Sequence, residues 1–129
     1  SFKEINDRYG HAVGDEALQE ITKRIMTNIR EIDIFGRYGG EEFVVLLIAN
    51  DLHSSSVVAE RIRRAVADQA IETKAGPIHV TISIGVDEFD SCCENLDTLI
   101  NRADRAMYIA KHNGRNQIAT LMNQKNIQC

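Results

Sequence analysis

Two adjacent glycines, Gly39 and Gly40, are followed by two adjacent glutamates, Glu41 and Glu42, directly before a run of apolar residues. A hairpin turn that needs positive φ would explain the glycines. It does not explain the glutamates, because successive carboxylates repel each other and point to opposite faces of a strand. A hard divalent cation such as Mg²⁺ relieves that repulsion, since it binds one or two carboxylates together with substrate phosphates. Taken alone, the motif is suggestive of a site for a metal and a nucleotide.

A second group of polar residues lies near the start, where Asn6, Asp7, His11 and Asp15 occupy a glycine-punctuated segment that leads into a helix. Turns and caps explain these residue types, because both favour Asn, Asp and Gly. The functional interpretation is recognition of a base. A carboxylate accepts from both donors on the guanine edge, and an Asn amide can donate and accept beside it. Adenine lacks that pair of donors, so an Asp here favours guanine.

A third group, Lys111 and Arg115, flanks the expected end of the last helix. Cations are common at helix C-termini because of the helix dipole. The same two residues are equally suited to clamp a triphosphate, Lys as a point charge and Arg as a fork of donors. Each of the three groups is weak evidence, and together they are stronger than any one.

The hydrophobic pattern predicts the elements that must position these groups. A helix is expected from Gly14 to Glu31, and a β-hairpin is expected from strands over 32–38 and 42–48, joined at the two glycines. The serines at 54–56 are expected to cap a second long helix. The remaining expected elements are a strand over 76–86, a helix over 95–113 and a short strand over 116–120, with Gly114 ending the helix in a left-handed conformation.

This order of elements predicts an α/β (α+β) sandwich with a mostly antiparallel central sheet flanked by helices, because hairpins make neighbouring strands antiparallel. A doubly wound dinucleotide fold is disfavoured, since no glycine-rich loop follows a first strand.

Composition sets outer limits. The chain has 129 residues, 43% hydrophobic and 26% charged, which fits one soluble domain. No apolar stretch approaches the length of a membrane span. The net charge of −4 argues against nucleic-acid binding through bulk positive charge. Two adjacent cysteines and one at the last position suggest neither a zinc site nor a disulfide framework, but reduced thiols in a cytosolic protein.

Four blocks of the sequence together resemble the GGDEF family, the diguanylate cyclases: "FKEINDRYGHAVGDEAL", "RYGGEEF", "VTISIGV" and "ADRAMYIAKHNGRNQI". The match runs from Phe2 to about Ala119, so a GGDEF domain is expected over 1–120 with a tail at 121–129. The resemblance implies an enzyme that condenses two GTP molecules into cyclic di-GMP and releases pyrophosphate. It also implies a fold like that of class III nucleotide cyclases and the polymerase palm.

The resemblance assigns roles to individual residues. Glu41 and Glu42 match the catalytic and metal-binding acidic positions, which implies Mg²⁺ or Mn²⁺ and a displacement assisted by two cations. The residues that match contacts to GTP are Phe2 and Lys3 near the phosphates, Asn6 and Asp15 at guanine, Gly39 and Gly40 packed on the nucleotide, and Lys111 and Arg115 at the triphosphate. One domain holds one GTP, so activity is expected from a homodimer whose two sites face each other.

The family also has a product-inhibition site with the pattern R-x-x-D. Arg30 and Asp33 have its spacing, and Arg61 matches its second arginine. An arginine fork suits the O6/N7 edge of guanine, which cyclic di-GMP presents. The alternative is that Arg30 merely ends a helix and Asp33 starts a strand; the resemblance favours the inhibitory site.

The sequence departs from the family at its start. The pattern D-x-D-x-F-K is represented only by Phe2 and Lys3, so the first helix, the first central strand and its metal-binding aspartate are expected to belong to a longer protein. The 129 residues alone are expected to have little cyclase activity and marginal stability.

Two other functions are alternatives to an active diguanylate cyclase. A catalytically silent GGDEF domain could bind GTP or cyclic di-GMP as a regulatory module, although its motif is usually degenerate and this one is intact. A cyclase with a mixed GMP–AMP product is disfavoured by Asp15. The expected location is the cytoplasm, with any membrane attachment through parts outside this segment.

Overall fold

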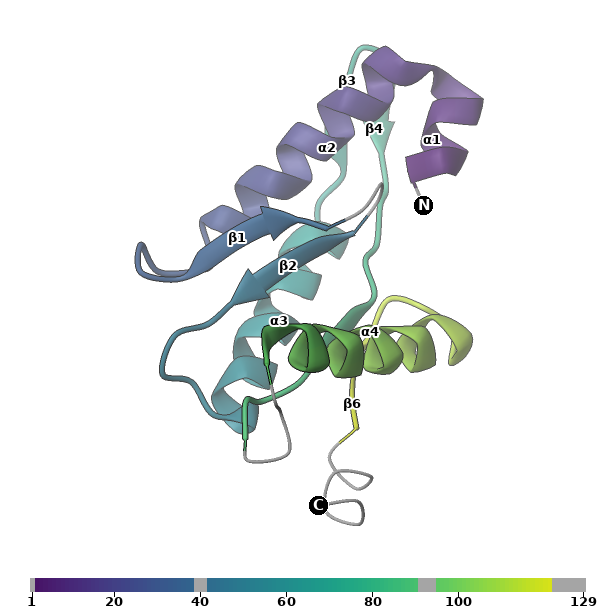
Figure 1. Ribbon diagram of the computed structural model, residues 1–129. Coiled ribbons are helices and arrows are strands. Elements are labelled where there is room, and N and C mark those ends of the chain that lie inside the picture. Colours follow the sequence, from purple (N-terminus) through teal and green to yellow (C-terminus); the bar gives the residue numbers. More distant parts are fainter. Residues whose placement is uncertain (1, 39–41, 91–94, 122–129) are drawn as a thin grey trace. The chain divides into compact units, whose positions relative to one another are not determined.

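The computed structural model describes residues 2–38, 42–90 and 95–121. Two compact units divide the chain, the first formed by residues 1–48 and 64–81 and the second by residues 49–63 and 82–129. Figure 1 labels most of their helices and strands. No helix of the described residues is both long enough and apolar enough to cross a membrane.

The first unit begins with two helices, α1 (Phe2–Tyr9) and α2 (His11–Met26), which pack on each other. The hydrophobic pattern predicts a single helix from Gly14 and no helix before it. Gly10, with φ of 91°, lets the chain turn between the two helices, a conformation that glycine adopts at little cost. Gly10, which the sequence predicts to lie in a loop, therefore forms a short break between two helices.

Helix α2 ends five residues earlier than expected. The side chains of Thr27 and Asn28 both donate to the carbonyl oxygen of Arg24, at 3.0 and 2.7 Å. Short polar side chains that bond the backbone in this way compete with continuation of a helix. The buried face of α2 follows helical spacing as expected and consists of Val13, Gly14, Ala17, Ile21 and Ile25.

Two antiparallel hairpins complete the first unit, together with the last residues of α3 (Leu52–Ala67). Strand β1 (Ile34–Arg37) pairs with β2 (Phe43–Leu46), as predicted, and the rings of Phe35 and Phe43 stack with centroids 5.4 Å apart. Strand β3 (Ile71–Thr73) pairs with β4 (Gly76–Ile78) and packs against α2. Ile71 and Val66 are fully buried, as is Ile21.

The single strand expected over 76–86 is wrong. Residues 76–78 form β4 of the second hairpin, residues 79–83 lie in no strand, and Ile84–Val86 form β5 in the other unit. Gly76, with φ of 92°, closes the tight turn between β3 and β4. Alternating apolar residues fit one long strand and two short ones equally well, so the pattern did not distinguish them.

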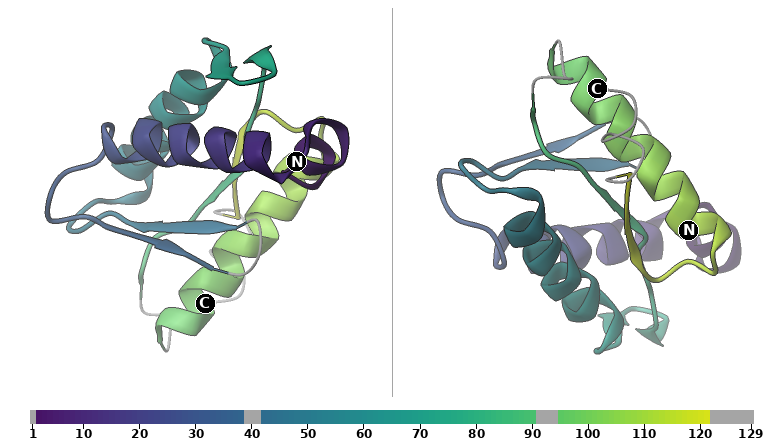
Figure 2. Two further views of the ribbon diagram at one scale, coloured as in Figure 1. Left: turned by 90° about the horizontal axis from the view of Figure 1, so that it is seen from above. Right: turned by 90° about the horizontal axis from the view of Figure 1, so that it is seen from below.

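The second unit contains most of α3, then β5 (Ile84–Val86), α4 (Leu96–His112) and β6 (Ile118–Thr120). Strands β5 and β6 pair in parallel, and both pack on α4. Figure 2 shows β6, in yellow, beside the green helix α4. A Cβ atom on Gly85 would lie 1.9 Å from the Ala103 carbonyl oxygen, so only glycine lets β5 approach α4 this closely. The helix over 95–113 and the short final strand are confirmed.

The serines at 54–56 do not cap α3. Asp51 does, because its Oδ1 accepts from the Ser54 amide at 2.8 Å, and the Leu52 amide donates to Glu88. Asp51 accepts from both the backbone and the side chain of Ser54, and these bonds lower the pKa of its carboxyl group. Ser55 is instead buried inside the helix. The fold class is α+β, as predicted, with the described strands in three pairs.

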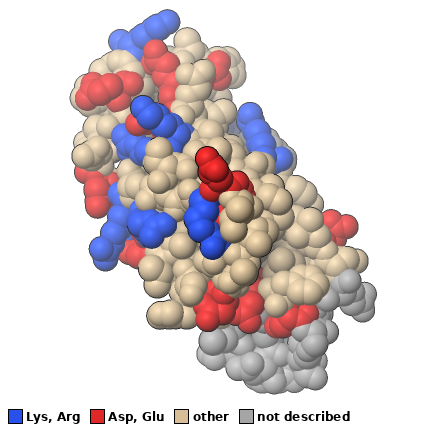
Figure 3. All heavy atoms as spheres, turned by 90° about the vertical axis from the view of Figure 1, so that its left-hand side faces the viewer, with Lys and Arg blue, Asp and Glu red and all other residues tan. Residues whose placement is uncertain are grey.

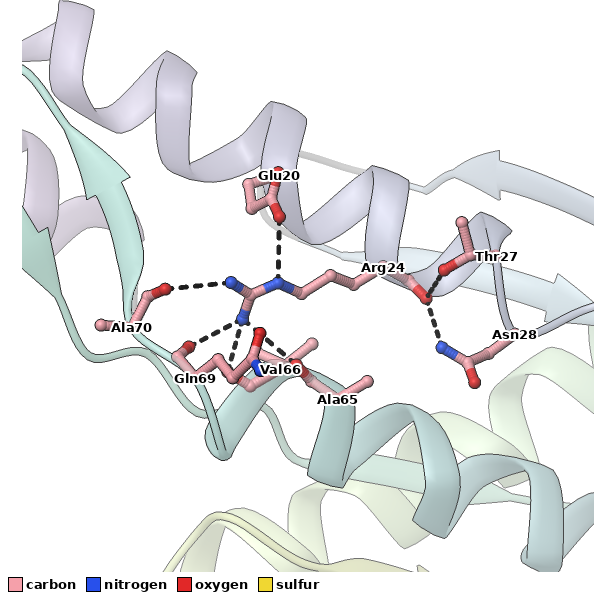
Figure 4. Close-up of polar contacts among 8 residues, drawn as sticks. All are labelled: Glu20, Arg24, Thr27, Asn28, Ala65, Val66, Gln69 and Ala70. Carbon is pink, nitrogen blue, oxygen red and sulfur yellow. Dashed lines mark hydrogen bonds and ion pairs between the residues drawn. The ribbon is translucent and has the colours of Figure 1, made fainter.

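One arginine joins three parts of the first unit. The guanidinium group of Arg24, on α2, donates to Glu20 at 3.2 Å and to four backbone carbonyls at 2.8–3.1 Å, as Figure 4 shows: those of Ala65, Val66, Gln69 and Ala70. The first two belong to the last turn of α3, whose carbonyls have no partner within the helix. The side chain is only 13% exposed. Arg24 therefore caps α3 and fixes the turn that leads into β3.

We expect Arg24→Met to lower the free energy of unfolding by about 2–3 kcal/mol, because several half-buried carbonyls lose a charged donor. Urea unfolding followed by circular dichroism measures this. Lys23→Met is the matched control, since Lys23 is the exposed neighbour on the same helix, and it should change stability by about 0.5 kcal/mol or less. Equal effects of the two variants would contradict the capping role.

Candidate functional site

The residues expected to read guanine lie at the junction of α1 and α2. Asn6 is half-buried in the last turn of α1, and its side chain lies against Gly14 of α2. A Cβ atom at position 14 would come within 1.7 Å of the Asn6 Oδ1 atom, so glycine is what makes room for this amide. Asp15, the next residue, is exposed. The fold thus brings the Asn6 side chain to the backbone of Gly14, the residue before Asp15.

No role for Gly14 was predicted from the sequence. A signal was present, because glycine inside a helix costs about 1 kcal/mol relative to alanine and usually has a packing reason. Here that reason is the side chain of Asn6. Lys3, which was expected near the phosphates, is exposed on α1, and Phe2 is the first residue of the same helix.

The hairpin that carries the paired glutamates is partly described. The Tyr38 amide donates to the carbonyl oxygen of Glu42 at 2.8 Å, extending the β1–β2 pairing to the base of the turn. Glu42 is half-buried. Gly39, Gly40 and Glu41 lie outside the described residues, so the expectations for them stay predictions.

Carboxylates are the donors that a hard cation such as Mg²⁺ takes, usually one or two of them with phosphate oxygens. Glu41 and Glu42 provide that chemistry, so the residue types at the hairpin fit the implied metal. Within the described ranges no three His, Cys, Asp or Glu side chains gather into a group that could hold a metal ion. The described residues therefore do not by themselves form the metal site that the motif implies.

The structure brings Arg30 and Asp33 together in the turn before β1. The guanidinium group donates to both carboxylate oxygens, at 2.9 Å from Nη2 and 3.2 Å from Nε, and the Arg30 amide donates at 2.8 Å. The Ile48 amide also donates to Asp33, at 3.0 Å, while its carbonyl accepts from Arg30. We call this set of bonds among Arg30, Asp33 and Ile48 the Arg30–Asp33 clasp.

The clasp has an electrostatic consequence. The bond from the Arg30 side chain, with those from the amides of Arg30 and Ile48, lowers the pKa of Asp33 to about 2, against an ordinary value of 3.8. The same pairing raises the pKa of Arg30. The Asp33 side chain is 2% exposed and that of Arg30 is 51% exposed. Arg30 does not end a helix, since α2 stops at Met26.

The other expected cationic residues belong to the second unit. Lys111 is exposed in the last turn of α4, and Arg115 is exposed just beyond it. Gly114 has φ of 112°, and the Arg115 amide donates to the Ala110 carbonyl oxygen at 3.0 Å, a bond typical of a helix ended by a left-handed residue. Arg61 is exposed on α3. On the face drawn in Figure 3, Lys and Arg side chains are interspersed with Asp and Glu.

Comparison with known proteins identifies the class. The chain matches the family model described as "Diguanylate cyclase, GGDEF domain" over residues 1–117. The chain therefore belongs to the GGDEF family. Its fold is accordingly that of the palm-like nucleotide cyclases, as predicted.

Individual relatives agree with this assignment. Diguanylate cyclase A of Treponema denticola is 44% identical over 122 residues, which is 95% of this chain and 33% of that protein. The structure of the active GGEEF domain of a diguanylate cyclase from Vibrio cholerae has a TM-score of 0.85 and 32% identity, covering 93% of this chain and 76% of that one. The GGDEF domain of DgcB from Caulobacter crescentus, solved in complex with c-di-GMP, has a TM-score of 0.85 and 28% identity, covering 92% and 71%. The chain spans about a third of the length of the first curated relative.

The lowered pKa of Asp33 gives a prediction with a definite sign. A carboxyl group with a lowered folded-state pKa stabilises the fold above its unfolded pKa, near 3.8, and loses that contribution as the pH falls through about 2. We expect Asp33→Asn to lower the free energy of unfolding by roughly 1–2 kcal/mol at pH 6, after allowance for solvent around Arg30. The gap between wild type and variant should close as the pH falls from 4 to 2.

Urea unfolding at a series of pH values measures that gap. Glu31→Gln removes one negative charge from the same turn and serves as the control. A gap that is independent of pH between 6 and 2 would show that Asp33 acts through something other than its ionised form.

Proposed function

We propose that this chain is the catalytic domain of a diguanylate cyclase, which condenses two GTP molecules into cyclic di-GMP. In each of two successive displacements, a ribose 3′-oxygen attacks the α-phosphorus of the other GTP and loses its proton. The bond from that phosphorus to the oxygen shared with the β-phosphate breaks, and pyrophosphate leaves with the electron pair. Two molecules of pyrophosphate are released for each cyclic product.

The observation that carries this proposal is the placement of Asn6 against Gly14, beside Asp15. A base bound at this junction would meet both the Asn6 amide and the Asp15 carboxylate. Two acceptors and an amide donor suit the guanine edge, whose N1–H and N2–H₂ both donate. Adenine would leave the carboxylate without its pair of donors, so the site would favour GTP over ATP.

Each remaining group would position a part of the substrate or balance its charge. Lys111 and Arg115 would contact the triphosphate, and Glu41 and Glu42 would provide oxygen ligands for Mg²⁺ or Mn²⁺. When bound, the metal would supply neutralisation of the charge that develops on the phosphate oxygens. Holding two nucleotides in line supplies most of the remaining rate enhancement. The two nucleotides would be held by two copies of the domain in a symmetric homodimer.

The Arg30–Asp33 clasp supports a proposal about regulation. Arg30 is half exposed while its guanidinium orientation is fixed by Asp33, so it could meet the guanine edge of the cyclic product without first being ordered. We propose that cyclic di-GMP binds there and inhibits the enzyme, with Arg61 as a second contact. Both this site and the reaction would lie in the cytoplasm, where GTP is available.

A substitution at the hairpin tests the reaction itself. We expect the full-length protein, incubated with GTP and Mg²⁺, to form cyclic di-GMP, and Glu41→Ala to lower the rate by roughly 10²-fold or more because charge neutralisation is lost. Chromatography of the nucleotides measures the product. Glu72→Ala, an exposed glutamate on β3, is the control and should leave the rate unchanged.

Equal product from wild type and Glu41→Ala would refute the catalytic assignment. Binding of GTP without turnover by the wild type would instead support the silent regulatory domain. In the same assay, added cyclic di-GMP should slow the wild type and have less effect on Arg30→Ala; equal inhibition of both would exclude the clasp as the product site.

A substitution at Gly14 tests the base-recognition site. In Gly14→Ala the new methyl group must displace the Asn6 side chain, which can rotate away, so the fold should survive while the affinity for GTP falls by roughly tenfold, the value of one hydrogen bond. Isothermal titration of the 129-residue chain with GTP measures this. Asn6→Ala should have a similar effect, and the double variant should be no weaker than either single one. An unchanged affinity in Gly14→Ala would remove Asn6 from the site.

A further inference from the structure

The segment that follows α4 has an unusual backbone. Residues 114–116 all have positive φ, of 112° for Gly114, 63° for Arg115 and 48° for Asn116. Glycine adopts this region without cost, whereas a residue with a long side chain does so only when its surroundings hold it there. We call residues 114–116 the post-helix turn. Because it contains Arg115, whatever holds this turn also decides where that cation points.

Hydrogen bonds from residues close in sequence connect the post-helix turn to α4. The Arg115 amide donates to the Ala110 carbonyl oxygen at 3.0 Å. The side-chain amide of Gln117 donates to the carbonyls of Asn113 and Arg115, at 2.9 and 3.1 Å. These bonds tie the turn to the end of α4 and to its own next residue.

A residue of helix α3 also bonds the post-helix turn. Arg63, on α3, donates from Nη1 to the Asn116 Oδ1 atom at 2.7 Å. Its other edge is bonded to Glu60 one helical turn earlier, at 2.7 Å from Nε and 2.8 Å from Nη2. The Arg63 side chain is only 17% exposed. All of these residues lie in the second unit.

The pairing with Glu60 has two effects on Arg63. It balances the charge of the guanidinium group, so the main effect of Arg63 on the turn is geometric. It also fixes the plane of the guanidinium group. Because this group is rigid and planar, its two edges cannot be oriented independently of each other. With its Nε–Nη2 edge on Glu60, the guanidinium group holds Nη1 in a defined direction, and Nη1 donates to Asn116.

From this geometry we infer that Arg63 is a positioning residue for Arg115: through Asn116 it keeps the post-helix turn in its left-handed conformation and so pre-organises Arg115 for a triphosphate. This inference rests on the proposed function, which gives Arg115 its contact with the nucleotide. A clamp held in place before binding loses less conformational freedom when the ligand arrives. Lys111 needs no such support, because it lies within α4 itself.

The test compares ligands with and without a triphosphate. We expect Arg63→Gln to weaken binding of GTP to the 129-residue chain by three- to tenfold and to leave binding of guanosine unchanged, with both affinities measured by titration calorimetry or by NMR shifts. A residue that only supports the fold would weaken both ligands alike. Arg64→Gln removes the same charge from the next, exposed position of α3 and is the matched control; it should leave GTP binding within twofold of wild type.

Three further experiments make the result decisive. In an Arg115→Ala background, Arg63→Gln should cause no additional loss of GTP affinity, because its effect passes through Arg115. Hydrogen exchange of the Arg115 amide should be faster in Arg63→Gln than in wild type, which needs no ligand. Asn116→Gly keeps the backbone conformation accessible, cuts the bond to Arg63 at an exposed position, and should reproduce the loss if Arg63→Gln fails to fold.

Unchanged GTP affinity in Arg63→Gln or Asn116→Gly would overturn the inference, as would an additional loss in the Arg115→Ala background. If the wild type binds guanosine but not GTP, Arg115 has no triphosphate to contact and the inference fails as well. If the wild type binds neither ligand, the proposed function fails; the exchange rate at Arg115 then still shows whether Arg63 holds the turn.

Discussion

The bonds from Arg24 to the backbone carbonyls at the end of α3 are the interaction on which the first unit depends. These four carbonyls, at the end of a helix and in the turn that follows it, would otherwise need water or another donor. One guanidinium group donates to all of them. Because Arg24 stands on α2, the same bonds fix that helix against the segment leading into β3. The other end of α2 carries Gly14 and Asp15. A structural cation thus holds the helix on which base recognition would depend.

Much of the fold could be predicted from local sequence, and the predictions that were wrong have identifiable causes. The hairpin of β1 and β2, helix α4 and strand β6 were predictable because apolar periodicity and turn residues agree in those segments. The break at Gly10, the early end of α2 at Thr27 and the splitting of the segment over 76–86 were not. Each depends on a few backbone torsions or on one side chain bonding to a carbonyl, and hydrophobic periodicity carries no information about either.

The candidate site shows the same division between residue identity and residue placement. Resemblance to the family predicts Asn6 and Asp15 as the guanine-reading pair. No pattern predicted that Gly14 makes room for the Asn6 amide, since that contact depends on how two helices meet. The cap of α3 was also predicted wrongly. Three serines near Asp51 are equally good caps by residue type, so the sequence did not distinguish them from Asp51. Residue types at the candidate site are therefore easier to predict from the sequence than the residues that position them.

The Arg30–Asp33 clasp shows why motif residues need not share one role. Asp33 accepts from the backbone and side chain of Arg30 and from the Ile48 amide, and its carboxylate is almost fully buried. A side chain so engaged has little capacity left for a ligand, whereas Arg30 is half exposed. Binding of a guanine edge would thus fall mainly to the arginine, and the aspartate would fix its direction. Loss of either residue would weaken the proposed recognition for different reasons. Removing Arg30 removes the donor, whereas removing Asp33 leaves a donor without a fixed geometry and breaks the bond to Ile48 beyond β2.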